Sequence, residues 1–304
     1  MKSKKFENQS YDSHRSHFDD YAEGGAQAEF ARSWLDADTV DAWRHQRIYR
    51  VVEPLINEKC SNSWLTVGDG RYGLDAQFLS SRECQVTASD ISGLLLEEAY
   101  EQELLKDFSV ENAEELSFSD EQFDFVFCKD AFHHFPRPIK ALYELLRVSK
   151  RGVILIEPSD HVLQGKLLDR AYAAARKFVG GIAKKSATYS TDYEESGNYV
   201  YRISKREMEK IALGLNYPII AFKGINDYFE EGMIREPLHI GGPLLRRAKV
   251  IIRIMDILSK LRLRDYRLIS VVFLKDGDNT SLVSSLLDAG YEVKQLTRNP
   301  YLPT

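Results

Sequence analysis

Short apolar runs alternate with helical patterns through the middle of the chain. The strand-like runs lie at residues 64–68, 85–89, 108–110, 123–128 and 153–157. Between them, residues 74–80, 92–103 and 138–148 repeat apolar positions every three or four residues, which is the period of an amphipathic helix. Strands that alternate with helices are typical of parallel βαβ units, because parallel neighbours need a long crossover. The pattern therefore predicts an α/β core that is doubly wound, with helices on both faces of the sheet.

The pattern changes on either side of this core. The first 20 residues are polar and predict a loose segment, whereas the apolar stripe that follows Asp38 and Thr39 predicts a helix before the first strand. Residues 160–200 are too long for an ordinary connection. The remaining elements are a helix at 204–215, a strand at 218–224, a mostly helical insertion at 230–264, a strand at 268–274 and a last helix.

A glycine motif occupies the first connection of the core. It has the form Gly68-x-Gly70-x-x-Gly73, and Asp90 closes the next apolar run about 20 residues later. Glycines let the backbone turn sharply and approach a ligand, and the following helix offers unpaired N–H groups at its positive end. A carboxylate after the second strand can accept both hydroxyls of a ribose. The motif predicts a site for a nucleoside-containing cofactor, and a purely structural glycine turn is the alternative.

Composition excludes several classes of protein. The net charge of −5 and the pI near 5.9 provide no global field for a nucleic acid. The three cysteines form no CxxC pair, which argues against a zinc site and against a disulfide framework. No apolar run reaches the ~20 residues that cross a bilayer, and the first residues lack the apolar centre of a signal peptide. We therefore expect a cytoplasmic protein with no integral membrane segment.

Basic residues gather locally in the helical insertion. Between residues 246 and 264 they alternate with isoleucine, leucine and valine. This pattern is typical of the solvated face of an amphipathic helix. A docking surface for an anionic substrate and contact with a membrane surface are the alternatives.

With these motifs in place, the chain resembles the class I S-adenosylmethionine-dependent methyltransferases that act on small molecules. The resemblance covers residues 40–160 well and 204–275 by element order only, and its most specific part is residues 110–158. It implies a Rossmann-like sheet of seven mostly parallel strands with one antiparallel strand, N-terminal helices, and helical insertions that form a lid. We therefore divide the chain into five sections. They are a flexible N-terminal segment and cap (1–39), the cofactor-binding core (40–160), a lid insertion (161–203), the C-terminal half of the core (204–275, with the helical insertion 230–264), and a C-terminal helix and tail (276–304).

The resemblance also implies roles for individual residues toward S-adenosyl-L-methionine. The three glycines would line its methionine part, Asp90 would hold the ribose hydroxyls, and Ile91 would pack against the adenine. The other positions that would touch the cofactor are Asn112, Ala113, Lys129 and Asp130. Asn112 stands where the family usually has an acid, and its amide oxygen can still accept a hydrogen bond from the adenine amino group.

The glycine motif departs from the common family pattern at one position. Asp69 replaces the usual small residue between the first two glycines, and Thr66 stands where an acid is frequent. A carboxylate so close to the cofactor could attract its α-ammonium group, so we include Asp69 among the cofactor-binding candidates.

Candidate catalytic residues follow the fourth and fifth strands. They are His134, His133, Glu157 and His161. Imidazole titrates near neutrality, so a histidine here could remove a proton from an acceptor hydroxyl, and packing is the alternative role. We expect methyl transfer to a small molecule such as a sugar or a surface-polysaccharide precursor, with no metal and no nucleic-acid partner, and a homodimer is the candidate assembly. An NAD(P)-dependent oxidoreductase and a non-catalytic, methyltransferase-like binding protein are the alternatives.

Overall fold

The computed structural model describes residues 2–22, 24–25, 27–56, 62–160, 193, 199–277 and 280–301, with only the backbone at residues 2–7. Helices of the N-terminal part precede the sheet: α1 (Lys2–Asp19), α2 (Ala28–Arg32), η1 (Ser33–Leu35), α3 (Val40–Tyr49) and η2 (Glu53–Leu55). The predicted start of α3 is confirmed, because the hydroxyl of Thr39 accepts a hydrogen bond from the backbone N–H of Ala42.

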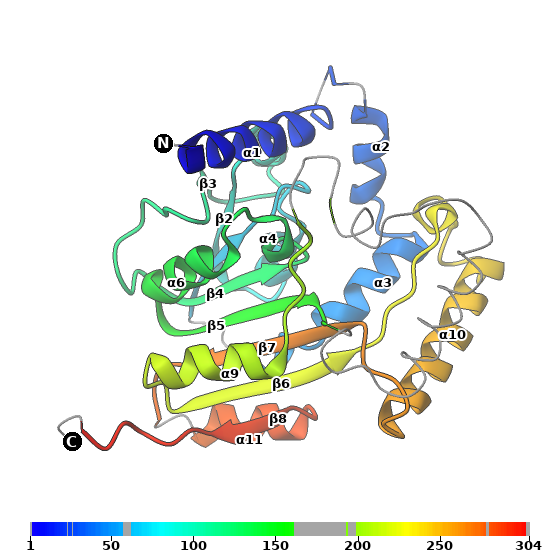
Figure 1. Ribbon diagram of the computed structural model, residues 1–304. Helices are drawn as coiled ribbons and strands as arrows, with labels where there is room; N and C mark the ends of the chain where they lie inside the picture. The colour runs from blue at the N-terminus through cyan, green and yellow to red at the C-terminus, as the bar shows by residue number, and fades with distance from the viewer. Residues whose placement is uncertain are drawn as a thin grey trace.

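In the described part of the chain, eight strands form one sheet, in the order β3-β2-β1-β4-β5-β7-β6-β8. The strands are β1 (Ser63–Val67), β2 (Gln85–Asp90), β3 (Phe108–Val110), β4 (Phe123–Lys129), β5 (Ser149–Pro158), β6 (Ile219–Ile225), β7 (Leu268–Leu274) and β8 (Glu292–Gln295). The connecting helices are α4 (Leu74–Ser80), α5 (Leu94–Glu101), η3 (Phe132–His134), α6 (Pro138–Val148), α9 (Lys205–Gly214), η4 (Glu231–Ile234), α10 (Pro243–Lys260) and α11 (Thr280–Asp288). Figure 1 shows this sheet between its covering helices.

The α/β, Rossmann-like fold is confirmed, and the count of strands differs from the expected seven. β1 to β5 pair in parallel, whereas β7 runs antiparallel to both β5 and β6, and β8 runs antiparallel to β6. Two strands are therefore antiparallel to the core instead of one. Strand β8 was not predicted because this edge strand, EVKQ, is short, mostly polar and nowhere fully buried.

Alternating side chains of the central strands divide the core into two layers. Phe125 and Phe127 of β4 face one cluster, which packs under η2, α4 and α11, whereas Val126 and Cys128 face the cluster under α6 and α9. Helices on both faces explain why β4 is apolar along most of its length. This confirms the doubly wound arrangement.

The N-terminal segment differs from expectation, because the residues expected to be loose form helix α1. The hydroxyl of Tyr11 donates to the Glu114 carboxylate at 2.6 Å, and that of Ser92 donates to Asp19 at 2.7 Å. These anchors are polar and lie more than 70 positions away in the sequence, so no apolar stripe marks the helix. In Figure 1, α1 lies at the same end of the molecule as β2 and β3.

Three further expectations concern the insertions, the cysteines and the membrane. The section 230–264 contains η4 and α10. Most of the lid section 161–203 lies outside the described residues, and the division of the chain into sections stays a prediction. Cys128 is free and buried, but Cys84 is disulfide-bonded, contrary to expectation. Within the described residues, no helix combines the length and apolarity needed to span a bilayer.

Candidate active site

A cavity of about 440 Å³ lies at the carboxyl ends of β1, β2, β4 and β5, within the usual size range of small-molecule sites. It brings together segments that are far apart in the sequence. Nine of the predicted site residues line it: Gly68, Asp69, Gly70, Asp90, Ile91, Asn112, Ala113, Lys129 and Asp130. His133 and His134 line it as well, whereas Gly73 and Glu157 lie behind its wall and His161 lies outside the described residues.

The glycine turn and Asp90 meet at the floor of this cavity. Gly68 has a φ of +75°, and a Cβ there would lie 2.3 Å from the Cβ of Ala131. A Cβ at Gly70 would lie 2.9 Å from Oδ2 of Asp90. Both positions therefore require glycine, one for its backbone conformation and one because the turn approaches a carboxylate.

The Asp90 carboxyl is nearly buried, and its surroundings do not favour its charge. Burial raises its pKa to about 6, although the backbone N–H groups of Ser92 and Gly70 partly offset this effect. Ser92 donates to Oδ1 at 2.9 Å. A buried carboxylate with remaining lone pairs beside a cavity is suited to accept hydroxyl donors from a ligand.

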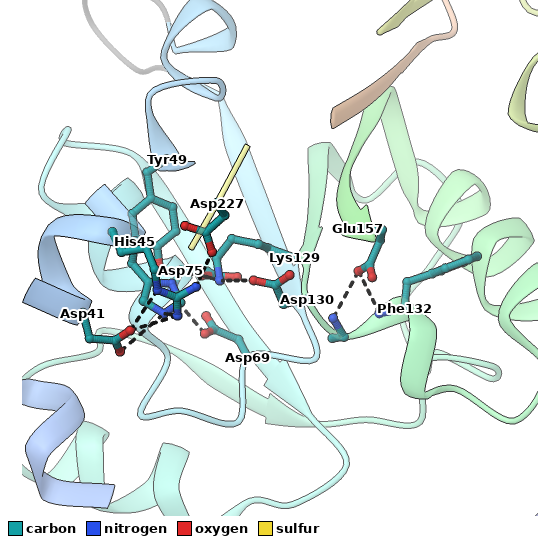
Figure 2. A network of polar contacts seen from close by, with 12 residues as sticks. Asp41, His45, Tyr49, Asp69, Asp75, Lys129, Asp130, Phe132, Glu157 and Asp227 are labelled. Atoms are coloured by element: carbon teal, nitrogen blue, oxygen red, sulfur yellow. Dashed lines mark hydrogen bonds and ion pairs between the residues drawn. The ribbon is translucent and has the colours of Figure 1, made fainter. Parts of the chain in front are cut away.

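A second polar unit lies where β4 and β5 end. The Glu157 carboxylate is completely buried, and its Oε1 accepts hydrogen bonds from the backbone N–H groups of Ala131 and Phe132 at 3.1 and 2.9 Å (Figure 2). Its Oε2 lies 2.6 Å from Nδ1 of His133, and a carboxylate can only accept, so Nδ1 carries the proton. Glu157 therefore fixes the orientation and tautomer of His133.

His134 is held differently from its neighbour. Its ring lies 4.0 Å from the ring of His133 and 6.0 Å from that of His14, measured between centroids. Both histidines are candidate bases in the sequence, and the structure gives the carboxylate partner to His133. Two adjacent histidines in a sequence do not show which one has this partner, because that depends on which ring points toward β5.

Comparison with known proteins adds the observation that decides the class of this domain. The sequence profile of the family described as "Methyltransferase domain" matches residues 65–156, which run from β1 to β5. These residues form a class I S-adenosylmethionine-dependent methyltransferase domain. The oxidoreductase alternative gains no support, because the dinucleotide-binding Rossmann sheet is parallel throughout, whereas here an antiparallel β7 separates β5 from β6.

Several solved structures of methyltransferases are similar to this chain at low sequence identity. One is a SAM-dependent methyltransferase from Methanosarcina mazei, with 17% identity, a TM-score of 0.46, and coverage of 75% of this chain and 97% of that chain. Another is a SAM-dependent methyltransferase from Archaeoglobus fulgidus, with 13% identity, a TM-score of 0.46, and coverage of 76% and 94%. A third is phosphoethanolamine N-methyltransferase 2 of Haemonchus contortus in complex with S-adenosyl-L-methionine, with 16% identity, a TM-score of 0.46, and coverage of 76% and 52%. No curated protein sequence matches the chain.

Within this domain, Asp69 has a structural role that the sequence did not reveal. Its carboxylate accepts hydrogen bonds from the hydroxyl of Thr66 and from the backbone N–H groups of Asp75 and Ala76, at 2.8 to 3.1 Å. The Asp69 carboxylate thereby provides hydrogen-bond acceptors for backbone N–H groups in the first turn of α4. The expected contact of Asp69 with an α-ammonium group stays a prediction.

Asn112 and Lys129 are likewise held by their own neighbours. Oδ1 of Asn112 accepts from the backbone N–H of Glu114 at 3.0 Å. The Lys129 ammonium lies 3.3 Å from Asp75 and 3.6 Å from Asp130 (Figure 2). Burial acts to raise the pKa of Asp130, but the charges of Lys129, His133 and two nearby arginines together outweigh burial and lower the pKa of that carboxyl. The cofactor contacts predicted for these residues stay predictions.

Helix α3 adds cavity residues that sequence reasoning missed. The Arg44 guanidinium binds the carboxylates of Asp41 and Asp227 at 2.9 and 2.5 Å. It also lies 3.1 Å from Nε2 of His45, which must accept because arginine only donates. Burial, together with nearby Lys129, lowers the pKa of His45 well below its usual value, so this ring is neutral and carries its proton on Nδ1. No residue of the described chain accepts from that Nδ1.

Within the described residues, no group of three or more His, Cys, Asp or Glu side chains has the arrangement of a metal site. The polar residues at the cavity form clusters around Asp90, Glu157, Lys129 and Arg44.

We expect the variant Gly70→Ala to lose at least tenfold in affinity for S-adenosylhomocysteine. Its methyl group would lie 2.9 Å from Oδ2 of Asp90 and would displace the carboxylate from the cavity floor. Gly214→Ala is the matched control, because nothing lies within 4 Å of a Cβ at that exposed position at the end of α9. Calorimetric titration of both variants checks this prediction, and equal affinities would contradict it.

Proposed function

We propose that this methyltransferase transfers a methyl group to a hydroxyl oxygen of a small molecule, with His133 as the proton acceptor. The observation that carries the proposal is that His133, which lines the cavity with the glycine turn and Asp90, is paired with Glu157, which is buried behind the cavity wall. An amine acceptor reacts through its neutral lone pair and needs no base, whereas a hydroxyl gains from one. A histidine whose tautomer is fixed by a carboxylate is suited to accept that proton, which supports a hydroxyl acceptor.

The cavity fits S-adenosyl-L-methionine in two respects. A Cβ would fill the space between Gly70 and Asp90, and the Asp90 carboxyl has acceptor capacity beyond the hydrogen bond from Ser92. When bound, the cofactor supplies an electrophilic methyl group. In this proposal, Asp90 binds the ribose hydroxyls, and the glycine turn and Ile91 border the rest of the cofactor.

The chain's own residues would then handle the proton. Glu157 keeps the proton of neutral His133 on Nδ1, so Nε2 is the nitrogen that can accept a proton from the hydroxyl. After transfer, the same carboxylate stabilises the imidazolium ring. The cavity walls would restrict the relative motion of the two bound reactants, which would lower the entropic part of the barrier.

We include a sugar or a surface-polysaccharide precursor in the proposal as the class of acceptor. The cavity combines aromatic rings with polar groups, and the flat face of a sugar packs well on an aromatic ring. Tyr49 and Phe229 line the part of the cavity that contains Arg44 and His45, where the Nδ1–H of His45 is a donor for a sugar oxygen.

Two measurements test this function in sequence. Calorimetric titration should show micromolar binding of S-adenosylhomocysteine and no response to NADH. Transfer of an isotopically labelled methyl group is then followed over a panel of free and nucleotide-linked sugars, with small amines as the comparison set. Transfer of the label to amines but not to sugars would overturn the assignment of the acceptor. Absence of S-adenosylhomocysteine binding would overturn the role of the cavity.

Cofactor binding should weaken in acid. The Asp90 pKa is about 6 without ligand, and hydroxyl donors of a bound ribose would stabilise the ionised form and lower that pKa. Binding therefore releases a proton below pH 6, and affinity for S-adenosylhomocysteine should be constant above pH 7 and fall up to about tenfold per pH unit below 6. Titrations from pH 5 to pH 8 check this, and a flat profile would contradict the ribose contact.

A further inference from the structure

Helix α10 has a continuous apolar stripe on its outer side. Val250, Ile254 and Ile257 are 57%, 52% and 49% exposed, and Leu261, at the end of the helix, is 63% exposed. These positions follow one another at intervals of three or four residues, so their side chains share one face of the helix. Figure 1 shows α10 at the periphery of the molecule.

The fold does not need this stripe. The opposite face of α10 carries Leu245, Ala248 and Ile252, which are buried against Val40 of α3 and Met233 of η4. A solvated outer face, the ordinary expectation for such a helix, would carry polar side chains at the four exposed positions. An exposed row of this length on a long helix indicates an interaction surface.

Cations flank the apolar stripe. The exposed basic side chains Arg246, Lys249, Arg253 and Lys260 lie along one side of it. The acid within α10, Asp256, instead accepts a hydrogen bond from Asn226 at 2.8 Å. This helix is therefore strongly basic in a chain whose net charge is −5.

We propose that α10 binds the surface of a bilayer that contains anionic phospholipid. An amphipathic helix with branched apolar residues and adjacent cations lies in the headgroup region, where the apolar side chains enter the acyl boundary and the cations meet phosphate groups. A second copy of the chain is the less favoured partner, because two such faces would bring like charges together. The overall negative charge does not oppose this contact, since salt screens charges beyond about 10 Å.

This surface is linked to the cavity through η4. α10 packs on η4, and Ile234 of η4 lines the cavity. Membrane contact by α10 would therefore hold this side of the cavity near the bilayer. The inference does not depend on the acceptor or on the transfer reaction.

Co-sedimentation of the full chain with vesicles tests the proposal. The protein should bind mixed vesicles of phosphatidylcholine and phosphatidylglycerol, show at least tenfold weaker binding to phosphatidylcholine alone, and dissociate as salt is raised. Ile254→Glu should weaken binding to the mixed vesicles at least tenfold. Leu287→Glu on α11 is the matched control, because Leu287 is 54% exposed on another helix, and it should bind as the wild type does.

The charge contribution is tested separately. Arg253→Glu should weaken binding to the mixed vesicles several-fold, whereas Lys210→Glu, an exposed position on α9, should leave it unchanged. Thermal melting confirms that each variant is folded. Failure of the wild type to bind the mixed vesicles, or equal effects of the paired substitutions, would overturn the proposal. A dimer in solution that Ile254→Glu dissociates, without vesicle binding by the wild type, would assign the surface to a second copy instead.

Discussion

Asp90→Asn should abolish cofactor binding and at the same time stabilise the free protein. The loss follows because an amide is a weaker acceptor than a carboxylate for two ribose hydroxyls, so affinity for S-adenosylhomocysteine should fall roughly 10²-fold or more. The gain in stability follows because the ionised Asp90 carboxyl of the wild type is buried. Its pKa is raised to about 6, so folding is penalised at neutral pH by an amount on the order of 1–3 kcal/mol, which the neutral amide avoids.

The pH dependence of this gain is its sharpest test. The folded-state pKa lies above the unfolded one, so the penalty is absent below pH 4, grows between pH 4 and 6, and is complete above 6. Melting temperatures should therefore favour Asp90→Asn by a few degrees at pH 7.5 and converge with the wild type near pH 4. A variant that loses both binding and stability would indicate that the substitution damages the fold, and retained affinity would contradict the role of Asp90.

Glu157→Gln should reduce kcat by about 10²- to 10⁴-fold with little change in cofactor affinity. The amide oxygen can still accept from the backbone N–H groups of Ala131 and Phe132, so the turn after β4 is kept. The amide nitrogen, however, would face Nδ1 of His133 and donate to it, which moves the ring proton to Nε2. A ring in that tautomer cannot accept a proton through Nε2.

Companion variants separate this role from a structural one. His133→Ala should reduce kcat to a similar extent, and the double variant should be little worse than either single one, because the two residues act as a unit. Glu157→Ala removes the acceptor of two buried N–H groups and should melt at a clearly lower temperature. Unchanged kcat in Glu157→Gln would show that Glu157 only supports the turn.

The sequence predicted the floor of the site better than its walls. Gly68, Gly70 and Asp90 were found because a βαβ unit places a turn and a following strand end side by side, so local spacing determines that contact. The hydrogen bonds of Asp69 to backbone groups of α4 were not predicted, because a sequence does not display such partners.

The walls depend on contacts between distant segments. Tyr11 reaches Glu114 across 103 positions, and Arg44 reaches Asp227 across 183. Polar pairs of this kind leave no periodic signal, so α1 was expected to be loose and α3 was credited with an apolar stripe alone. Strand β8 also leaves no periodic signal, because it pairs with β6 through backbone groups and its side chains are mostly polar.

Helix α1 has a consequence for the exchange of ligands. Tyr11, His14 and Phe18 form part of the cavity wall, so this helix covers bound ligands. It is attached by a few polar contacts, including the donation from Arg137 to the Tyr11 hydroxyl at 2.9 Å. Such contacts contribute about 1 kcal/mol each and break readily compared with an apolar core. We therefore expect detachment of α1 to precede product release, and turnover to be limited by this opening instead of by chemistry when the acceptor is abundant.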